Sequence, residues 1–244
     1  MIEIKHVSIK RQQKQIVHDV SFTISPGRIF MLLGENGCGK TTLIKGMIHE
    51  YPLAEGRICY DGKDMNTMTL KQRAAIFSYI PQIKPIIANM LCKDVVVSGW
   101  NRHMQLFDIP DEQAYEQARK IMAKFKIDPL FDQTIDTISG GQLQLVYLCR
   151  AFLQDASCIL MDEPCTYLDF MKQHLFLQHT KELAKQGYSV LLSIHDPQLA
   201  LTYGDEILFM HQGTLIADLK KEKDDLPAQL RALYRKIYSQ DVFF

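Results

Sequence analysis

One glycine-rich segment of the 244-residue chain has the residue types needed to hold the phosphate groups of a nucleotide. Gly34-Glu-Asn-Gly-Cys-Gly-Lys40-Thr41 satisfies the pattern G-x-x-x-x-G-K-[ST], with an apolar run before it and a helical pattern after it. Glycines let the backbone form a concavity lined by N–H groups, and a helix beginning near Lys40 adds its positive dipole end. Lys40 supplies a charge for the β- and γ-phosphates, and the Thr41 hydroxyl can ligate Mg²⁺. The predicted nucleotide contacts are Gly34, Glu35, Asn36, Gly37, Cys38, Gly39, Lys40, Thr41 and Thr42.

Two adjacent carboxylates, Asp162 and Glu163, directly follow the apolar run Cys158–Met161. Acids at the carboxyl end of a buried strand lie where open α/β sheets bind their ligands. Neighbouring residues of an extended chain point to opposite sides, so the two acids can have different functions. We expect Asp162 to hold Mg²⁺ and Glu163 to polarise an attacking water. On its own this pattern is a weak signal, but it becomes a strong one beside the phosphate loop.

Further motifs, in a consistent order along the chain, are similar to those of one enzyme family. Ser139-Gly-Gly-Gln142 resembles the signature motif of the ATP-binding-cassette (ABC) ATPases, and Tyr79-Ile-Pro-Gln82 resembles their Q-loop. Thr166-Tyr-Leu-Asp169 resembles their D-loop, and His195 resembles their switch histidine. This resemblance covers nearly the whole chain. It implies that the protein binds and hydrolyses ATP with Mg²⁺ as the metal.

The resemblance also implies roles for single residues outside the phosphate loop. Gln82 is expected to take part in catalysis and to ligate Mg²⁺, and His195 to contact the γ-phosphate or the attacking water. The aromatic residue that stacks on adenine in the family should fall near Arg11, where this chain has no Tyr or Phe. Arg11 could stack on the base through its guanidinium plane, or another side chain could do so.

A second anion site is expected at the signature motif. Ser139, Gly140, Gly141 and Gln142 stand at the start of a helical pattern, where a hydroxyl, backbone N–H groups and a helix dipole suit a γ-phosphate. One chain already surrounds the phosphates with its own loop, so this site must serve the ATP of another copy. Two identical chains related by a two-fold axis would place Ser139 of each against Lys40 of the other. The predicted partner is therefore a second copy of the chain, paired head to tail.

Apolar runs and helical patterns alternate along the sequence, which predicts a largely parallel α/β sheet. The expected strands are Ile29–Leu33, Cys158–Met161, Ser189–Ile194 and Ile207–Met210. The expected helices are Lys40–Ile48, Glu112–Phe125, Gln142–Leu153 and Phe170–Gln186.

The fold class expected from these elements and from the resemblance is an α/β P-loop NTPase (RecA-like) core with two additions. Glu3–Ile9 and Val17–Ile24 alternate like the strands of an antiparallel hairpin, and Asp61-Gly62 and Gln212-Gly213 are hairpin turn signals. We predict one domain over residues 1–244. Residues 1–82 and 156–218 form the nucleotide-binding core with its β subdomain, residues 83–155 an inserted helical subdomain with the signature motif, and residues 219–244 a helical tail.

The predicted tail carries an apolar stripe at helical spacing, for which two interpretations compete. Either the stripe packs against its own domain, which is the preferred interpretation, or it binds a partner. The stripe consists of Leu226, Leu230, Leu233, Tyr234, Ile237 and Tyr238.

Composition narrows the classes of function. The 28 basic and 28 acidic residues cancel, so no broad positive surface indicates a nucleic-acid partner. No apolar run approaches the roughly 18 residues of a membrane helix, and the N-terminus does not resemble a signal peptide. The six cysteines show no metal-finger spacing and are expected to be reduced thiols of an intracellular protein.

Three biological roles fit an ABC ATPase. The protein could drive a transporter whose membrane subunits are separate chains, act as a soluble ATPase on nucleic acid or ribosomes, or regulate without turnover. A single cassette, a short insertion and zero net charge favour the first role, and the presence of Glu163 and His195 disfavours the third.

Three segments are similar to importers of iron–siderophore complexes, haem and cobalamin: Asp94–Asn101, Glu163–Asp169 and His195–Ala200. The resemblance implies permease subunits, an indirect link to a substrate-binding protein, and a place at the cytoplasmic face of the cell membrane. It leaves an importer for another substrate open, because specificity normally resides in the other subunits.

Overall fold

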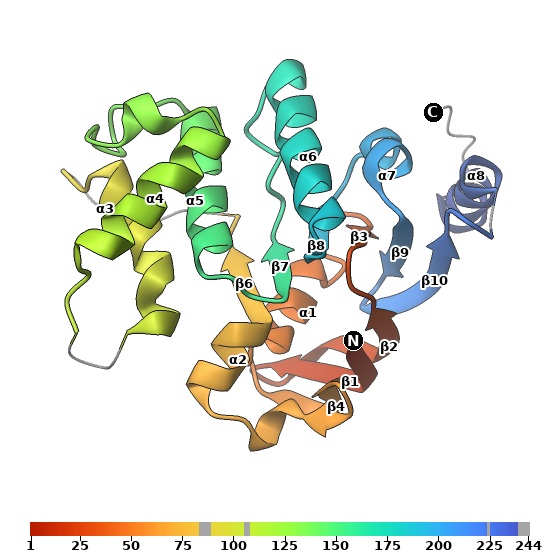
Figure 1. Ribbon diagram of the computed structural model, residues 1–244. Helices are drawn as coiled ribbons and strands as arrows, with labels where there is room; N and C mark the ends of the chain where they lie inside the picture. Colours follow the sequence, from red (N-terminus) through yellow and green to blue (C-terminus); the bar gives the residue numbers. More distant parts are fainter. Residues whose placement is uncertain (83–88, 105–107, 224, 239–244) are drawn as a thin grey trace.

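A six-stranded sheet lies at the centre of the fold in the computed structural model, which describes residues 1–82, 89–104, 108–223 and 225–238 (Figure 1). Its strand order is β10-β9-β3-β8-β7-β6. Every neighbouring pair is parallel except β9 and β10, which form a hairpin closed by Gln212 and Gly213. The strands are β3 (Ile29–Leu33), β6 (Phe77–Ile80), β7 (Cys158–Met161), β8 (Ser189–Ile194), β9 (Glu206–His211) and β10 (Thr214–Lys220).

Three of the four expected strands of this sheet have the predicted bounds, and Ile207–Met210 lies within the slightly longer β9. The parallel α/β core with its antiparallel addition is therefore confirmed. The sequence analysis did not identify β6 as a strand. It has only four residues, and helix α2 (Leu70–Ile76) runs directly into it without a turn residue between them.

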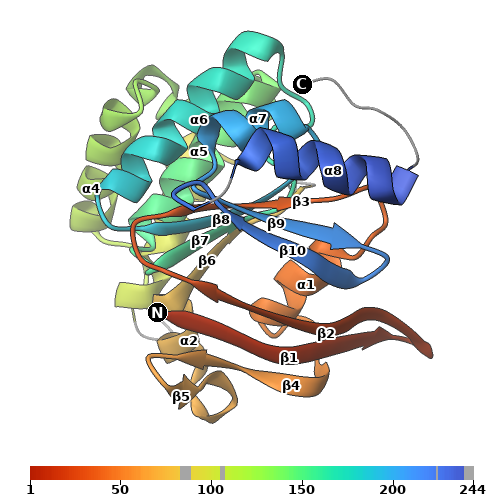
Figure 2. The same ribbon diagram turned by 90° about the vertical axis from the view of Figure 1, so that its right-hand side faces the viewer.

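A second, four-stranded antiparallel sheet has the order β2-β1-β4-β5 and lies below the first in Figure 2. The predicted N-terminal hairpin is confirmed, but its strands are longer than expected. Arg11 pairs with Lys14, so the polar residues at 10–15 mostly belong to the strands and not to a loop. The strands are β1 (Ile2–Arg11), β2 (Lys14–Ile24), β4 (Leu53–Tyr60) and β5 (Lys63–Asp64).

Buried side chains on both faces of the central strands β3 and β7 explain why these strands read as continuous apolar runs. In β3, Phe30 and Leu32 face the four-stranded sheet and α1 (Lys40–Met47), whereas Ile29, Met31 and Leu33 face the opposite cluster. Helix α1 thus lies between the two sheets (Figure 2). All six cysteines are buried and free.

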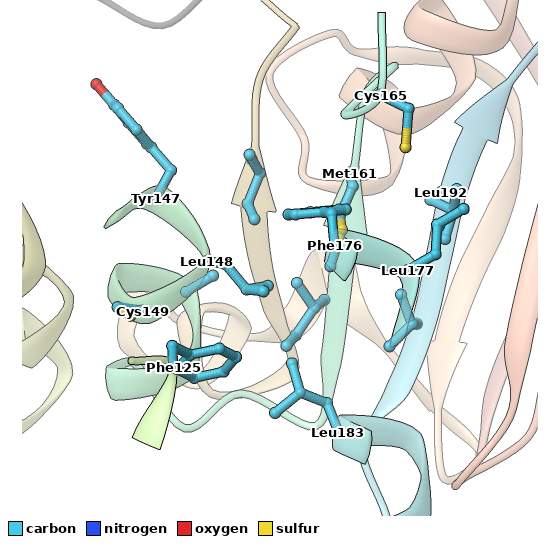
Figure 3. Close-up of a cluster of buried hydrophobic side chains, with 14 of the residues drawn as sticks. Phe125, Tyr147, Leu148, Cys149, Met161, Cys165, Phe176, Leu177, Leu183 and Leu192 are labelled. Carbon is cyan, nitrogen blue, oxygen red and sulfur yellow. The ribbon is translucent and has the colours of Figure 1, made fainter. Parts of the chain in front are cut away.

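The opposite face of the large sheet is covered by helices. Phe176 and Leu177 of α6 (Phe170–Lys185) pack near Met161 of β7 and Leu192 of β8 (Figure 3). Three helices form a separate layer on the left of Figure 1, namely α3 (Cys92–Val97), α4 (Glu112–Lys124) and α5 (Gly140–Leu153). Short 3₁₀ helices at Ser98–His103 and Asp128–Leu130 connect them.

The expected helices α1, α4, α5 and α6 are confirmed to within two residues at each end. Three short helices, α2, α3 and α7 (Pro197–Tyr203), were missed, since six or seven residues span too few turns to show a period.

The C-terminal helix α8 (Leu226–Tyr238) packs against its own domain, as the preferred interpretation of the apolar stripe predicts. Leu226 and Leu230 are buried, and the remaining members of the stripe pack on the same core cluster. The helix begins later than the predicted tail, because Leu219 and Lys220 pair with β9 as the end of β10. Residues 239–244 of that tail lie outside the described residues.

Candidate nucleotide site

Four neighbouring strands bring most of the predicted catalytic residues to one edge of the large sheet. The strands β3, β8, β7 and β6 are adjacent and parallel, so their carboxyl ends meet there. The phosphate loop follows β3 and Gln82 follows β6. Asp162 and Glu163 follow β7, and His195 follows β8. The strand order therefore gathers segments that are far apart in the sequence.

The phosphate loop ends in a helix terminus that no side chain caps. Gly39 is the N-cap of α1, with φ of 111°, a conformation that residues with a Cβ rarely adopt. Because the terminus lacks a side-chain cap, the N–H groups of its first turn are left for an anion. Gly34 is needed for close packing, since a Cβ there would lie 2.3 Å from the Met210 carbonyl oxygen.

Lys40 is almost completely buried, with 4 % of its surface exposed. Its Nζ donates hydrogen bonds to the carbonyl oxygens of Gly34 (2.7 Å) and Glu35 (2.9 Å). The same atom lies 4.0 Å from Oε1 of Glu163. The ammonium group is therefore held between the loop and the acid pair, where it can reach a phosphate group.

The side chain of Glu35 turns toward the C-terminal part of the chain. Its Oε1 lies 3.0 Å from Nδ1 of His211 at the end of β9. The His211 ring meets Tyr238 of α8 edge to face, with 6.0 Å between ring centroids. The sequence analysis did not foresee this link between the last helix and the phosphate loop, which joins residues distant along the chain.

The middle of the loop passes from an exposed stretch to a buried one. Asn36 and Gly37 are exposed, whereas Cys38 is buried, and burial raises the pKa of its thiol. A buried cysteine with a raised pKa is a poor nucleophile. Thr42, the last predicted contact, is half-buried in the first turn of α1.

Asp162 is a buried carboxylate that accepts two short hydrogen bonds. Thr41 Oγ1 donates to its Oδ1 at 3.0 Å, and Ser193 Oγ donates to the same oxygen at 2.8 Å. Burial raises the pKa of Asp162 above its ordinary value, although both hydroxyl hydrogen bonds act in the opposite direction. Ser193, on β8, was not predicted as a site residue.

Glu163 is held by partners from three different segments. Its Oε2 accepts hydrogen bonds from Gln82 Nε2 (2.8 Å) and from Thr166 Oγ1 (3.1 Å), while its backbone N–H donates to Ser193 Oγ (2.8 Å). The side chain is 13 % exposed, which leaves access for a water molecule. The backbone φ of Glu163 is 43°, in the left-handed region, which is uncommon for a residue with a Cβ.

His195 is exposed and stands one residue after the end of β8. The next residue, Asp196, caps helix α7 by accepting hydrogen bonds from the N–H groups of Gln198 (2.8 Å) and Leu199 (3.3 Å). The chain direction after His195 is therefore fixed, while its imidazole remains open to a ligand.

The signature segment lies apart from the phosphate loop of its own chain. Ser139 is the N-cap of α5 and forms a capping box with Gln142: each side chain bonds the other's backbone N–H, at 3.3 and 2.8 Å. Ser139, Gly140 and Gln142 are exposed. A small apolar cavity beside them is lined by α5, by Leu168 and by residues of α6, and by none from the phosphate loop.

Arg11, the predicted adenine contact, stacks on an aromatic ring that the sequence analysis did not consider. Its guanidinium carbon lies 3.7 Å from the ring centroid of Tyr51. One face of the guanidinium group is therefore covered by protein, and its contact with adenine remains a prediction.

Two side chains at the nucleotide site, one at the end of the phosphate loop and one just after β7, fit a magnesium ion that binds together with a nucleotide. The Thr41 hydroxyl and the Asp162 carboxylate supply oxygen ligands, which Mg²⁺ prefers. Within the described ranges no cluster of three or more His, Cys, Asp or Glu could hold a metal ion alone. Phosphate oxygens would have to complete the coordination, as is common for Mg²⁺. Gln82, the third predicted ligand, contacts Glu163 in this structure, so its metal role remains a prediction.

Comparison with known proteins assigns the chain to a family. Residues 17–166 match the family described as ABC transporter. A Helicobacter pylori (strain ATCC 700392 / 26695) protein named "Probable iron chelatin transport ATP-binding protein" is 35% identical over 226 residues, covering 89% of each chain. "Manganese transport system ATP-binding protein MntB" of Bacillus subtilis (strain 168) is 31% identical over 212 residues, covering 86% of this chain and 83% of MntB.

A solved structure has the same fold as this chain. The ADP conformation of MJ1267, an ATP-binding cassette of an ABC transporter, superimposes with a TM-score of 0.86 at 23% identity, covering 99% of both chains. The chain therefore belongs to the ABC transporter family, which confirms the resemblance inferred from its motifs. Within that family it is an ATP-binding ATPase subunit. None of its described helices has the length and apolar composition needed to cross a bilayer.

Proposed function

We propose that this ATPase powers uptake of an iron–siderophore complex, or else of haem or cobalamin, through separate permease subunits. The observation that carries the proposal is the 35% identity, over most of both chains, to a relative named for iron chelatin transport. The three importer-like segments at 94–101, 163–169 and 195–200 support the same subfamily.

Hydrolysis would proceed from the residues gathered at the sheet edge. Glu163, held by Gln82 and Thr166, would take the proton of the attacking water. Lys40 would leave the loop carbonyls for the β- and γ-phosphates, and exposed His195 would contact the γ-phosphate or the water. Thr41, Asp162 and Gln82 would hold Mg²⁺, which supplies charge neutralisation at the phosphate oxygens.

A head-to-tail homodimer would complete each site. The exposed Ser139 and the helix terminus after it would form an anion site, and the cavity beside them is lined by no residue of the phosphate loop of the same chain. A second copy related by a two-fold axis could present its bound ATP to Ser139, and the reciprocal contact would form at the same time. ATP would then join the two chains, and loss of the γ-phosphate would let them separate.

The permease would bind beside the helical layer, at the cytoplasmic face of the membrane. Gln82 contacts Glu163 at the ATP site and precedes the helical layer in the sequence, so a nucleotide-dependent change at Gln82 could reach a membrane partner. Residues around 83–105, which lie partly outside the described residues, would form the cleft for a permease coupling helix. A substrate-binding protein would act on the permease and not on this chain, and we expect no nucleic-acid partner.

Manganese is a second candidate cargo, because MntB is 31% identical to this chain. Each candidate cargo requires a different permease but the same ATPase, so the ATP site does not distinguish the two cargoes.

Uptake measurements in cells that lack this gene test the proposal. The deletion should abolish accumulation of radiolabelled iron supplied as a chelate and leave manganese uptake unchanged. The wild-type gene should restore iron accumulation in these cells, and a gene encoding the Glu163→Gln variant should not. Loss of manganese uptake alone would favour the second candidate, and normal uptake of both metals would contradict both an iron and a manganese cargo.

A further inference from the structure

The hydroxyl of Ser193 joins the two acids of the ATP site through one atom. Ser193 lies on β8, where the parallel pairing of Met161 with Leu192 brings it beside Asp162 of the neighbouring strand end. It is completely buried. Its Oγ accepts a hydrogen bond from the Glu163 N–H and donates one to Asp162 Oδ1, both at 2.8 Å.

The chemistry of a hydroxyl fixes the direction of these two bonds. A serine carries one proton and two lone pairs, and an ionised carboxylate can only accept. The proton of Ser193 is therefore committed to Asp162, and a lone pair is committed to the Glu163 N–H. The arrangement orients the acid expected to hold Mg²⁺ relative to the backbone of the acid expected to activate water.

The backbone of Glu163 needs such support. Its φ of 43° is a sparsely populated conformation, which persists when the surrounding structure holds it in place. The contacts from Gln82 and Thr166 hold only the carboxylate end of the side chain. The bond to Ser193 acts instead on the peptide that sets the direction of the side chain.

We propose that Ser193 is a positioning residue for hydrolysis, holding Glu163 in the conformation that aims its carboxylate at the attacking water. This inference rests on the proposed role of Glu163 as the general base. Ser193 is completely buried and both of its hydrogen bonds go to protein groups, so we expect it to touch neither the nucleotide nor the water. Its loss should therefore affect the chemical step and not the binding of ATP.

Ser78 provides a matched control on the opposite neighbour of β7. It lies on β6, is also completely buried, and its hydroxyl makes no hydrogen bond among the described residues. Ser78→Ala and Ser193→Ala remove the same atom from the same sheet at the same burial. Only the second change removes the connection between the acids.

The test compares these two variants with wild type in steady-state ATP hydrolysis, ATP binding and amide hydrogen exchange. Ser193→Ala should lower kcat on the order of 10²-fold, the effect expected of a misplaced catalytic group, with KM and ATP affinity within about threefold of wild type. The Glu163 amide should exchange faster in the nucleotide-free protein. Ser78→Ala should leave kcat, KM and this amide unchanged.

A combined variant separates this inference from the proposed function. If Ser193 acts through Glu163, Ser193→Ala should have no further effect on single-turnover hydrolysis in a Glu163→Gln background. If the rate loss of the double variant equals the product of the two single losses, the inference is overturned. The same holds if Ser78→Ala slows hydrolysis as much as Ser193→Ala, or if Ser193→Ala has a kcat near wild type. Full activity of Glu163→Gln alone would instead overturn the proposed role of Glu163.

Discussion

Glu163→Gln is expected to lower the rate of ATP hydrolysis by roughly 10²- to 10⁴-fold, the usual effect of removing a positioned general base. Glutamine keeps the shape of the side chain and can still accept hydrogen bonds from Gln82 and Thr166. It cannot take up the proton of the attacking water. ATP affinity should remain close to wild type, because Glu163 is not among the predicted phosphate contacts. Phosphate release and fluorescent-nucleotide titration measure the two quantities.

Glu182→Gln is the matched control for this change. Glu182 lies on α6, is exposed, and pairs with Lys185 at 2.7 Å. The Glu182→Gln variant should hydrolyse ATP at the wild-type rate. Wild-type turnover in Glu163→Gln would remove Glu163 from the catalytic role and leave the acid pair with a purely structural function.

Lys40→Ala should abolish ATP binding at concentrations that saturate the wild-type protein. The Lys40 ammonium is buried between the phosphate loop and Glu163, and two charge-assisted hydrogen bonds to phosphate oxygens would be lost with it. At about 1.5–3 kcal/mol for each such bond, the affinity should fall by on the order of 10²-fold or more. Isothermal calorimetry with ATP and Mg²⁺ would measure the change.

Lys45→Ala removes a lysine from the last turn of the same helix and serves as the control. Lys45 pairs with Glu50 at 2.8 Å, outside the phosphate loop, and its loss should not alter ATP affinity. An unchanged dissociation constant in Lys40→Ala would contradict the assignment of the loop.

The site residues whose positions depend only on local sequence could be predicted, because their spacing alone places them at a strand end or a helix start. The phosphate loop, the acid pair and the signature segment each depend on a strand end or a helix start within a few residues. The strands β3 and β7 are uniformly apolar and β8 is mostly so, since both faces of the sheet are covered there, and their bounds were correct for that reason.

Residues that act across strands could not be predicted. Ser193 reaches Asp162 only because β8 lies beside β7, and nothing within β8 distinguishes it from other small buried residues. His211 meets Glu35, and Tyr51 meets Arg11, through pairings between distant segments. Backbone conformation is also hidden in the sequence, as the left-handed φ of Glu163 illustrates.

Short elements next to one another were the other source of error. Helix α2 has a sequence-local start signal, since Thr69 and Gln72 form a capping box, yet it passes directly into β6. Seven residues of helix followed by four of strand show neither period clearly. The location of Gln82 therefore came from its resemblance to a known motif and not from the strand that positions it.

The central claim is that each chain supplies half of every ATP site. Light scattering of purified Glu163→Gln protein measures this directly, because blocked hydrolysis keeps ATP in place. With Mg²⁺ and ATP the measured molar mass should be that of two chains, and without nucleotide it should be that of one chain. A protein that remains monomeric with Mg²⁺-ATP, even when its permease is supplied, would contradict the shared site.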